Sequence, residues 1–145
     1  DVAIDGTKAR VWVLLSDIPR AAKMIPGVQS VNLQVDGTYR ITMRIRVGAI
    51  GFNLAGIVSV EEDEQAGKWN VRAEARDPRV GGGVVSVVET IVSEFAQGTT
   101  EIHVDADTQF SGRLGQLGQP LAMRKVDALF KEFIGNLKMA VADVP

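Results

Sequence analysis

The sequence contains no cysteine and only one histidine, and none of its apolar runs is long. Without cysteine there is no disulfide framework, no thiolate metal site and no cysteine nucleophile. A single histidine removes most acid–base mechanisms that depend on an imidazole. No apolar run approaches the roughly 18 residues of a membrane-spanning helix, and the first residues lack the pattern of a signal peptide. We therefore expect neither feature in this chain.

An excess of charge of one sign is also missing, because 18 acidic residues nearly balance 16 basic ones, for a formal net charge of −2. This balance argues against a general nucleic-acid binder, whose affinity comes largely from basic contacts to phosphate. The 145 residues, 46% hydrophobic and 23% charged, predict one soluble globular domain over residues 1–145. The chain begins without methionine and stops directly after a helical pattern. A further tail that anchors or docks the full-length protein therefore stays open as an interpretation.

Two short helices are predicted after an initial strand at Asp1–Ile4. Gly6-Thr7 opens a run with apolar residues at helical spacing, namely Val11, Trp12, Leu14 and Leu15. Asp17, a good capping residue, and Pro19, which is tolerated in a first turn, predict a break and a restart. The second helix is predicted over Ile18–Met24.

From Val28 onward the apolar residues recur at every second position, which predicts six strands joined by hairpins. The first of these leads to a hairpin at Asp36-Gly37. Its apolar positions are Val31, Leu33 and Val35. In a later strand Gly56 predicts a bend or a bulge. The strand over residues 84–95 is apolar at both parities, so which of its faces turns inward stays open.

The last segment has the pattern of one long amphipathic helix. Its apolar positions are Leu114, Leu117, Leu121, Leu129, Phe130, Phe133 and Leu137. A continuous helix from Ser111 to Ala140 would be about 45 Å long. Pro120 predicts a kink in that helix or a restart.

Two glycine-rich segments have alternative interpretations. Gly112, Gly115 and Gly118 each cost a helix about 1 kcal/mol relative to alanine. They indicate either a flexible segment at a cavity mouth or a loop before a helix that starts near Pro120. The run Gly81–Gly83 lacks the lysine and the following helix of a phosphate-binding loop, and it predicts a mobile connection or gate.

Together these patterns predict an α+β fold with a curved, seven-stranded antiparallel sheet around a long C-terminal helix. Two short helices follow the first strand. The strands have one apolar face, which must be covered, and the long helix is the only segment large enough to cover it. A curved sheet around one helix does not close tightly along its whole length. We therefore expect an apolar cavity between the two.

Several motifs, in this order and spacing, resemble the CoxG-like family, named for the G subunit of carbon monoxide dehydrogenase, within the START-like, or SRPBCC, superfamily. The opening motif is residues 11–17 followed by Ile25-Pro26-Gly27-Val28. Gly98-Thr99-Thr100 precedes the last strand, and the closing motif is residues 112–118 followed by residues 130–137. The resemblance extends from Ala3 to about Ala140 and implies the helix-grip fold.

The resemblance implies a non-enzymatic accessory protein whose apolar cavity binds an isoprenoid quinone of the menaquinone or ubiquinone type. Such a protein would link a molybdenum carbon monoxide dehydrogenase, or a related molybdenum hydroxylase, to the membrane quinone pool. It would be cytoplasmic, with peripheral contact at the inner face of the plasma membrane, and would have no covalent cofactor. Two alternatives stay open. One is a recruitment or assembly factor without a ligand, and the other is an enzyme of the same fold, such as a polyketide cyclase or aromatase.

No catalytic residue is predicted, because Glu89 is the only candidate for an inward acid and the phase of its strand is open. Tyr39 is the one expected inward hydroxyl and the best candidate for a polar contact to a carbonyl. The residues expected to line the cavity are Tyr39, Ile41, Met43, Phe52, Leu54, Val58, Trp69, Val71, Ile102, Val104, Phe110, Leu114, Leu117, Leu121 and Phe130.

Three charged sets have a structural and a functional interpretation each. Glu101, His103, Asp105 and Asp107 share one face of a strand, but that face is expected to be in water rather than at a metal. Arg40, Arg44 and Arg46 are expected on a solvated face, paired with neighbours such as Glu61 or Glu74, or to form a docking patch for an acidic partner. Arg124, Lys131 and Lys138 recur every seventh residue, for solubility or for contact with anionic lipid.

Overall fold

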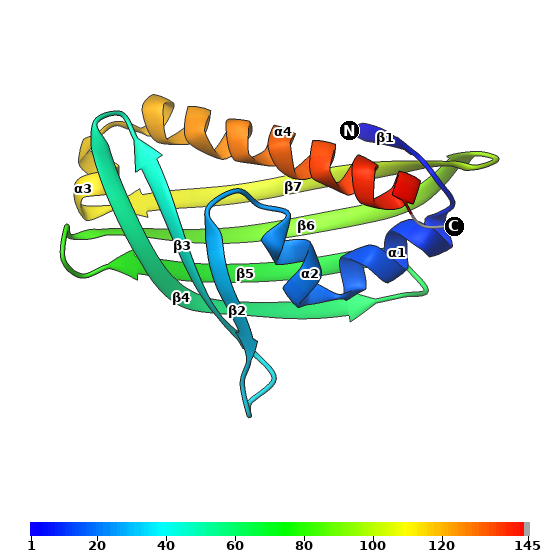
Figure 1. Cartoon of the computed structure of the whole chain (residues 1–145), viewed down its shortest axis with the longest axis horizontal. Helices are drawn as coiled ribbons and strands as arrows, with labels where there is room; N and C mark the ends of the chain where they lie inside the picture. The colour runs from blue at the N-terminus through cyan, green and yellow to red at the C-terminus, as the bar shows by residue number, and fades with distance from the viewer. Residues whose placement is uncertain (144–145) are drawn as a thin grey trace.

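All seven predicted strands form one antiparallel sheet (Figure 1) in the computed structural model, which describes residues 1–143. The strands are β1 (Val2–Asp5), β2 (Val28–Leu33), β3 (Tyr39–Val47), β4 (Ile50–Asp63), β5 (Lys68–Asp77), β6 (Gly82–Ala96) and β7 (Thr99–Ser111). Their order in the sheet is β1-β7-β6-β5-β4-β3-β2, so the first strand pairs with the last one. The helices are α1 (Lys8–Ser16), α2 (Ile18–Lys23), α3 (Gly112–Gln116) and α4 (Gln119–Asp143). This arrangement confirms the predicted fold class.

Side chains at the predicted starts cap both N-terminal helices. The Thr7 hydroxyl accepts a hydrogen bond from the Arg10 N–H at 3.2 Å, which satisfies one of the free donors of α1. Asp17 does the same for the Arg20 N–H at 3.4 Å, and Pro19 lies in the first turn of α2. The break between the two helices is therefore set by local chemistry.

The first predicted strand of the hairpin series is too long by two residues. β2 ends at Leu33, and Val35 lies fully exposed at the tip of the hairpin. The Gln34 N–H donates to the Thr38 carbonyl at 2.8 Å, which closes the turn earlier than the alternation predicted. Asp36 holds the turn by accepting hydrogen bonds from the N–H and the hydroxyl of Thr38.

At Gly56 the structure has a bend and a close approach, but no bulge. The register of β4 is continuous against β3 and β5 through this position. A Cβ atom on Gly56 would overlap the carbonyl oxygen of Glu74 on β5. Glycine thus lets β5 approach where the long strand β4 curves (Figure 1).

The pairing of β6 determines the phase that the sequence left open. Ser86 lies opposite the inward Ala73 of β5, so the even-numbered residues of β6 face the concave side. Glu89 faces outward and forms an ion pair with Lys68 at 3.1 Å. Val87 also faces outward and is 48% exposed. The alternation was hidden because the outer face of this strand is apolar as well.

The run Gly81–Gly83 is not the predicted free connection. Gly82 and Gly83 are buried residues of β6, and a Cβ on Gly82 would lie 3.0 Å from the ring of Phe52. The Gly81 carbonyl accepts a hydrogen bond from the Arg113 N–H at the start of α3. These glycines are therefore needed for close packing, and no gate is formed by a free loop here.

The C-terminal helix is not continuous from Ser111 to Ala140. Of the two interpretations of Pro120, a kink or a restart, the structure shows the restart. Gly118 has φ +96°, which breaks the helical backbone between α3 and α4. Pro120 lies in the first turn of α4, where its missing N–H costs nothing. The Ala122 N–H donates to the Gly118 carbonyl and begins the new helix. The proline therefore marks a restart rather than a kink.

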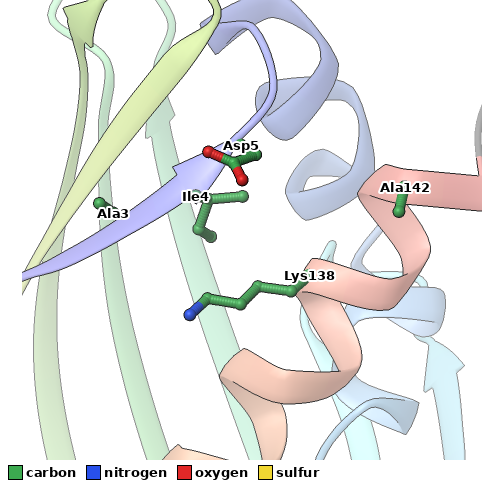
Figure 2. A pocket seen from close by; sticks show the side chains of 5 residues that line it. All are labelled: Ala3, Ile4, Asp5, Lys138 and Ala142. Carbon is green, nitrogen blue, oxygen red and sulfur yellow. The ribbon is translucent and has the colours of Figure 1, made fainter.

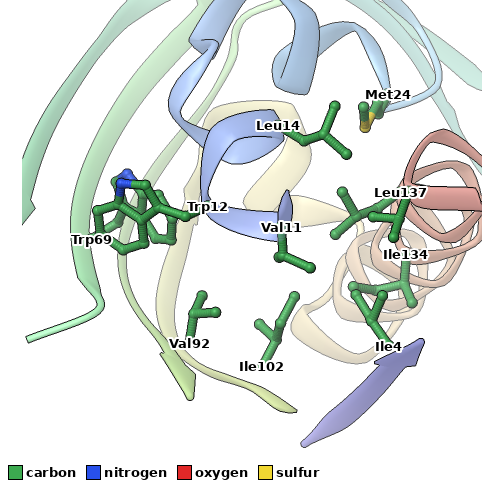
Figure 3. Close-up of a cluster of buried hydrophobic side chains, with 11 residues drawn as sticks. Ile4, Val11, Trp12, Leu14, Met24, Trp69, Val92, Ile102, Ile134 and Leu137 are labelled. Carbon is green, nitrogen blue, oxygen red and sulfur yellow. The ribbon is translucent and has the colours of Figure 1, made fainter. Parts of the chain in front are cut away.

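Two separate clusters of buried side chains lie at the two ends of the sheet and of α4. The first cluster joins α1, the C-terminal half of α4 and one end of the sheet (Figure 3). It contains Ile4, Val11, Trp12, Leu14, Met24, Trp69, Val92, Ile102, Ile134, Leu137 and Val141. The second cluster, beside α3, contains Val47, Phe52, Leu54 and Leu114. We call these the α1 cluster and the α3 cluster.

Candidate ligand-binding groove

Helix α4 contacts the sheet at its two ends. Near its N-terminus it approaches β3, and the Leu121 side chain lies next to Gly48. Near its C-terminus it approaches β1, and Leu137 and Val141 pack with Ile4 in the α1 cluster. Figure 1 shows α4 passing along the concave side between these two contacts. The middle of the sheet is therefore covered less tightly than its ends.

Three rows of residues cross the concave face between the two clusters, and we call them the central rows. The strand register defines them. The first is Tyr39–Val58–Ala73–Ser86–Thr108, the second is Ile41–Gly56–Ala75–Val84–Phe110, and the third is Val60–Val71–Val88–Ala106. Every member is half-buried except Ala106, which is exposed. This mainly apolar face is therefore less completely buried than the two clusters, although Val60 and Val71 pack against the α1 cluster and Ala75, Val84 and Phe110 against the α3 cluster.

Half-buried apolar side chains of α4 share the helix face that packs toward the sheet. Met123, Val126 and Phe130 continue the buried line of Ile134 and Leu137 at helical spacing, so they share the face that α4 turns to the sheet. All three are half-buried rather than buried. Half-buried apolar side chains of the sheet and of α4 therefore define a candidate groove, whereas the apolar cavity expected from the sequence stays a prediction, because the two defined hollows lie elsewhere.

The structure distributes the predicted lining residues over the groove and both clusters. Those in the central rows are Tyr39, Ile41, Val58, Val71 and Phe110. Those half-buried at the edge of a cluster are Met43, Leu117, Leu121, Val104 and Phe130. Those buried inside a cluster are Phe52, Leu54, Leu114, Trp69 and Ile102. The last set forms packed core at the two ends of the groove.

Two polar residues of the central rows were missed by the sequence analysis. The hydroxyls of Ser86 and Thr108 lie 2.9 Å apart on adjacent strands, on the concave face. The alternation of β7, continued past Ala106 to Phe110, could have indicated Thr108. Nothing in the sequence could have indicated Ser86, because its strand is apolar at both parities.

None of the residues in the central rows has a carboxyl, amino or imidazole group. Asp77 is buried at the end of β5, where it accepts hydrogen bonds from the backbone N–H groups of Asn53, Arg79 and Val80. These three hydrogen bonds hold the pKa of Asp77 below its usual value, and the bond from Asn53 has the largest effect. This carboxylate thus organises the β5–β6 turn.

The outward charged sets lie where they were expected, with one correction. His103 is exposed and contacts Asp1, and no cluster of three potential metal ligands is found among the described residues. Arg44 donates to Asn53 at 2.9 Å rather than pairing with Glu61 or Glu74. Glu74 pairs instead with Arg72 of its own strand. The register places Arg40 and Arg46 opposite Ile57 and Gly51, so no acid of β4 faces them.

Two defined hollows lie outside the central rows. One, of about 210 Å³, is between β1 and the last turns of α4, and Figure 2 shows its lining residues Ala3, Ile4, Asp5, Lys138 and Ala142. The other, of about 370 Å³, lies beside the β5–β6 turn and is lined in part by outward residues such as Thr42, Asn53 and Ala55. The first is smaller than the roughly 300–1,000 Å³ of typical ligand pockets.

The sequence model of the CoxG family, which is described as the G subunit of carbon monoxide dehydrogenase, matches residues 1–142. The chain belongs to this family. The match spans β1 to nearly the end of α4, so it includes the groove and both clusters that bound it. A comparison with curated proteins gave no match.

Solved structures share the fold of this CoxG-family chain at low sequence identity. A conserved protein from Geobacillus kaustophilus has a TM-score of 0.88 at 18% identity, over 97% of this chain and 91% of that one. The Zhui aromatase/cyclase from Streptomyces sp. R1128 has a TM-score of 0.59 at 17% identity, over 97% and 87% of the two chains. A protein from Thermus thermophilus has a TM-score of 0.66 at 13% identity, over 97% and 93%. These similarities establish the fold.

Within residues 1–143, no helix combines the length and the apolar character needed to cross a bilayer.

Proposed function

We propose that the protein is a non-enzymatic carrier that binds an isoprenoid quinone, of the menaquinone or ubiquinone type, in the groove between the central rows and α4. In this proposal it presents the quinone to a molybdenum carbon monoxide dehydrogenase or a related hydroxylase, and so links that enzyme to the membrane quinone pool. The observation that carries the proposal is the half-buried apolar face between two packed clusters. Family membership supports the choice of partner.

The groove suits a long hydrocarbon tail for energetic reasons. Burying apolar surface contributes about 25 cal/mol per Å², so a tail that covers the central rows would supply much of the affinity without polar partners. The α1 and α3 clusters hold sheet and helix together at both ends. We therefore expect the protein to keep its fold whether or not the middle is filled.

The chemistry of the groove favours a carrier over a cyclase or aromatase. General acid–base catalysis needs a titratable group within hydrogen-bond reach of the reacting atoms. Tyr39 is the one titratable residue of the central rows, and the acid considered from the sequence, Glu89, faces outward. The aromatase/cyclase of the same fold is less than 20% identical, so the likeness does not transfer its activity.

Peripheral membrane contact is part of the same proposal. Arg124, Lys131 and Lys138 are all exposed along α4, on the helix that roofs the groove. Each basic residue near an anionic surface contributes about 1 kcal/mol. The helix would then approach the bilayer from which a quinone is collected.

The test is extraction of the purified protein with organic solvent and mass spectrometry, followed by titration of the extracted protein with menaquinone-4. A near-stoichiometric quinone, or saturable binding on titration, is the expected result. Ala73→Phe should weaken binding because it fills the central row. Ala55→Phe, on the outward face of the adjacent strand β4, is the matched control and should not. Absence of binding at saturating quinone would overturn the carrier and favour a recruitment factor without a ligand.

A further inference from the structure

We propose that the Ser86–Thr108 hydroxyl pair is the polar subsite of the groove, which hydrogen-bonds a carbonyl oxygen on the ring of a neutral ligand. The ring lies over Ala73 of β5, next to the pair in the first central row, and the hydrocarbon tail extends toward β3 and β2. This inference rests on the proposed function, because it assigns the orientation and the head-group chemistry of a ligand in that groove.

The position of the pair singles it out. Ser86 and Thr108 are direct register partners on β6 and β7, both are half-buried, and both belong to the first central row. Tyr39, the other hydroxyl of that row, lies three strands away from Ser86, which is roughly 14 Å at the usual strand spacing. The pair is therefore the polar feature of the β6–β7 side of the floor.

The hydrogen-bonding capacity of the pair is not used up internally. Two hydroxyls have two O–H protons, and the 2.9 Å contact between Ser86 and Thr108 uses one of them. The strand carbonyls nearby are engaged in the β5–β6–β7 ladders. The second proton is then available to water or to a ligand acceptor. A carbonyl oxygen that takes the place of this water keeps the donor satisfied.

The neighbours of the pair on the concave face are all apolar. Ala73 is next to Ser86 in the row, Val84 and Val88 flank Ser86 along β6, and Ala106 and Phe110 flank Thr108 along β7. β1 pairs with β7 only at Thr99–Ile102, so the half of β7 that carries Thr108 is a free rim of the sheet. The exposed Ala106 lies on the same part of β7. A ring held here is close to the mouth of the groove.

The opposite side of the floor suits a hydrocarbon tail. Val58, Tyr39 and Ile41 are larger than the alanines near the pair, and β2 adds Val31 opposite Ile41 and Leu33 opposite Tyr39. Leu33 is 65% exposed. An apolar track thus leads from the hydroxyl pair to the β2 edge.

The charge of the groove restricts the head group. None of the central-row residues has a cationic side chain that could neutralise a carboxylate. An ionised group taken out of water without a partner is costly. The geometry therefore favours a neutral carbonyl-bearing ring over a free fatty acid, although both have long apolar tails.

The experiment compares the double variant Ser86→Ala/Thr108→Val with Thr42→Val, because either single substitution leaves one hydroxyl that can still donate to the ligand. Thr42 forms an equivalent hydroxyl pair with Ser30, at 2.5 Å, on the opposite face of the same sheet, so its variant controls for the loss of a cross-strand hydrogen bond. Each protein is incubated with vesicles that contain menaquinone-4 or squalene, an isoprenoid hydrocarbon without oxygen. The protein is then separated by gel filtration, and its bound probe is quantified by mass spectrometry.

We expect the double variant to bind menaquinone-4 about 3- to 10-fold more weakly, which corresponds to the loss of one hydrogen bond. Squalene binding should stay within about twofold in all variants, and Thr42→Val should match the wild type for both probes. If the wild type binds menaquinone-4 and the double variant binds it equally well, the subsite is wrong and the carrier stands. If the wild type binds neither probe, both the carrier and the subsite are wrong.

Discussion

The indole rings of Trp12 on α1 and Trp69 on β5 stack with their centroids 3.7 Å apart and their planes 25° apart (Figure 3). They are the two tryptophans of the sequence. Trp69 Nε1 is buried and has no hydrogen-bond partner among the described residues. This contact joins the helical layer to the sheet at the α1 end of the groove. Because Trp69 has the unsatisfied N–H, we expect the two rings to contribute differently to the free energy of unfolding.

We expect both Trp69→Phe and Trp12→Phe to lower the free energy of unfolding. The loss for Trp69→Phe should be smaller, by about 1 kcal/mol. Both changes remove part of the stacked surface, but only the first also removes a buried, unsatisfied N–H, which costs about 1–3 kcal/mol. Urea denaturation measures both values. The exciton couplet of the indole pair in circular dichroism should disappear in each variant. An equal or larger loss for Trp69→Phe would contradict this prediction.

Gly56→Ala should destabilise the protein severely, by about 3 kcal/mol or more, because the new Cβ would overlap the β5 backbone where β4 bends. Gly51→Ala is the matched control, since Gly51 is in the same strand and a Cβ there meets no atom within 4 Å. The melting temperatures of the two variants check this. Similar values for both would show that β5 can move away from position 56.

The pH dependence of stability should include a contribution from Asp77. Its pKa is lowered in the folded state by the Asn53, Val80 and Arg79 N–H groups. The stabilisation is therefore present above the unfolded pKa of about 3.9 and is lost as the pH falls through the lower folded value. Asp77→Asn should be less stable than the wild type at pH 7, and the difference should shrink toward pH 3. A difference that does not change between pH 7 and pH 3 would refute this role.

Leu137→Ala should cost about 2–5 kcal/mol, because it leaves a cavity in the α1 cluster. Met139→Ala, two residues further along α4 at a side chain that is 66% exposed, should change stability by less than about 0.5 kcal/mol. Denaturant titration of both variants separates the buried end of α4 from its solvent face. Equal losses would show that the helix is oriented differently.

Local chemistry in the sequence was sufficient for most of the fold. Thr7 and Asp17 cap helices where their residue types predicted, and Pro120 starts a helix as prolines in a first turn do. The phase of β6 could not be predicted, because outward Val85 and Val87 mimic core positions. Only the register with β5 and β7, which depends on residues distant in sequence, determines it.

The sequence could predict which side chains face the candidate groove, but not how deeply each of them is buried. Alternation places Tyr39 and Phe52 on the same face of the sheet. One of them is half-buried in the central rows, and the other lies in the α3 cluster. Burial depends on where α3 and α4 contact the sheet, which period-two patterns do not contain. The Ser86–Thr108 pair could not be predicted, because finding it requires both the phase of β6 and the register between β6 and β7.

The pairing of β1 with β7 has a consequence for biosynthesis. The Gly6 N–H donates to the Gly98 carbonyl, and the Thr100 hydroxyl donates to the Gly6 carbonyl, both at 2.7 Å. β1, which is synthesised before the other six strands of this sheet, therefore has no partner until β7 has been made. The hairpins from β2 to β6 can form from neighbouring residues, whereas closing β1 onto the sheet joins segments nearly a hundred residues apart. Such long-range closure slows folding, so we expect β1, although it precedes the other strands of this sheet in the sequence, to be among the last to pair.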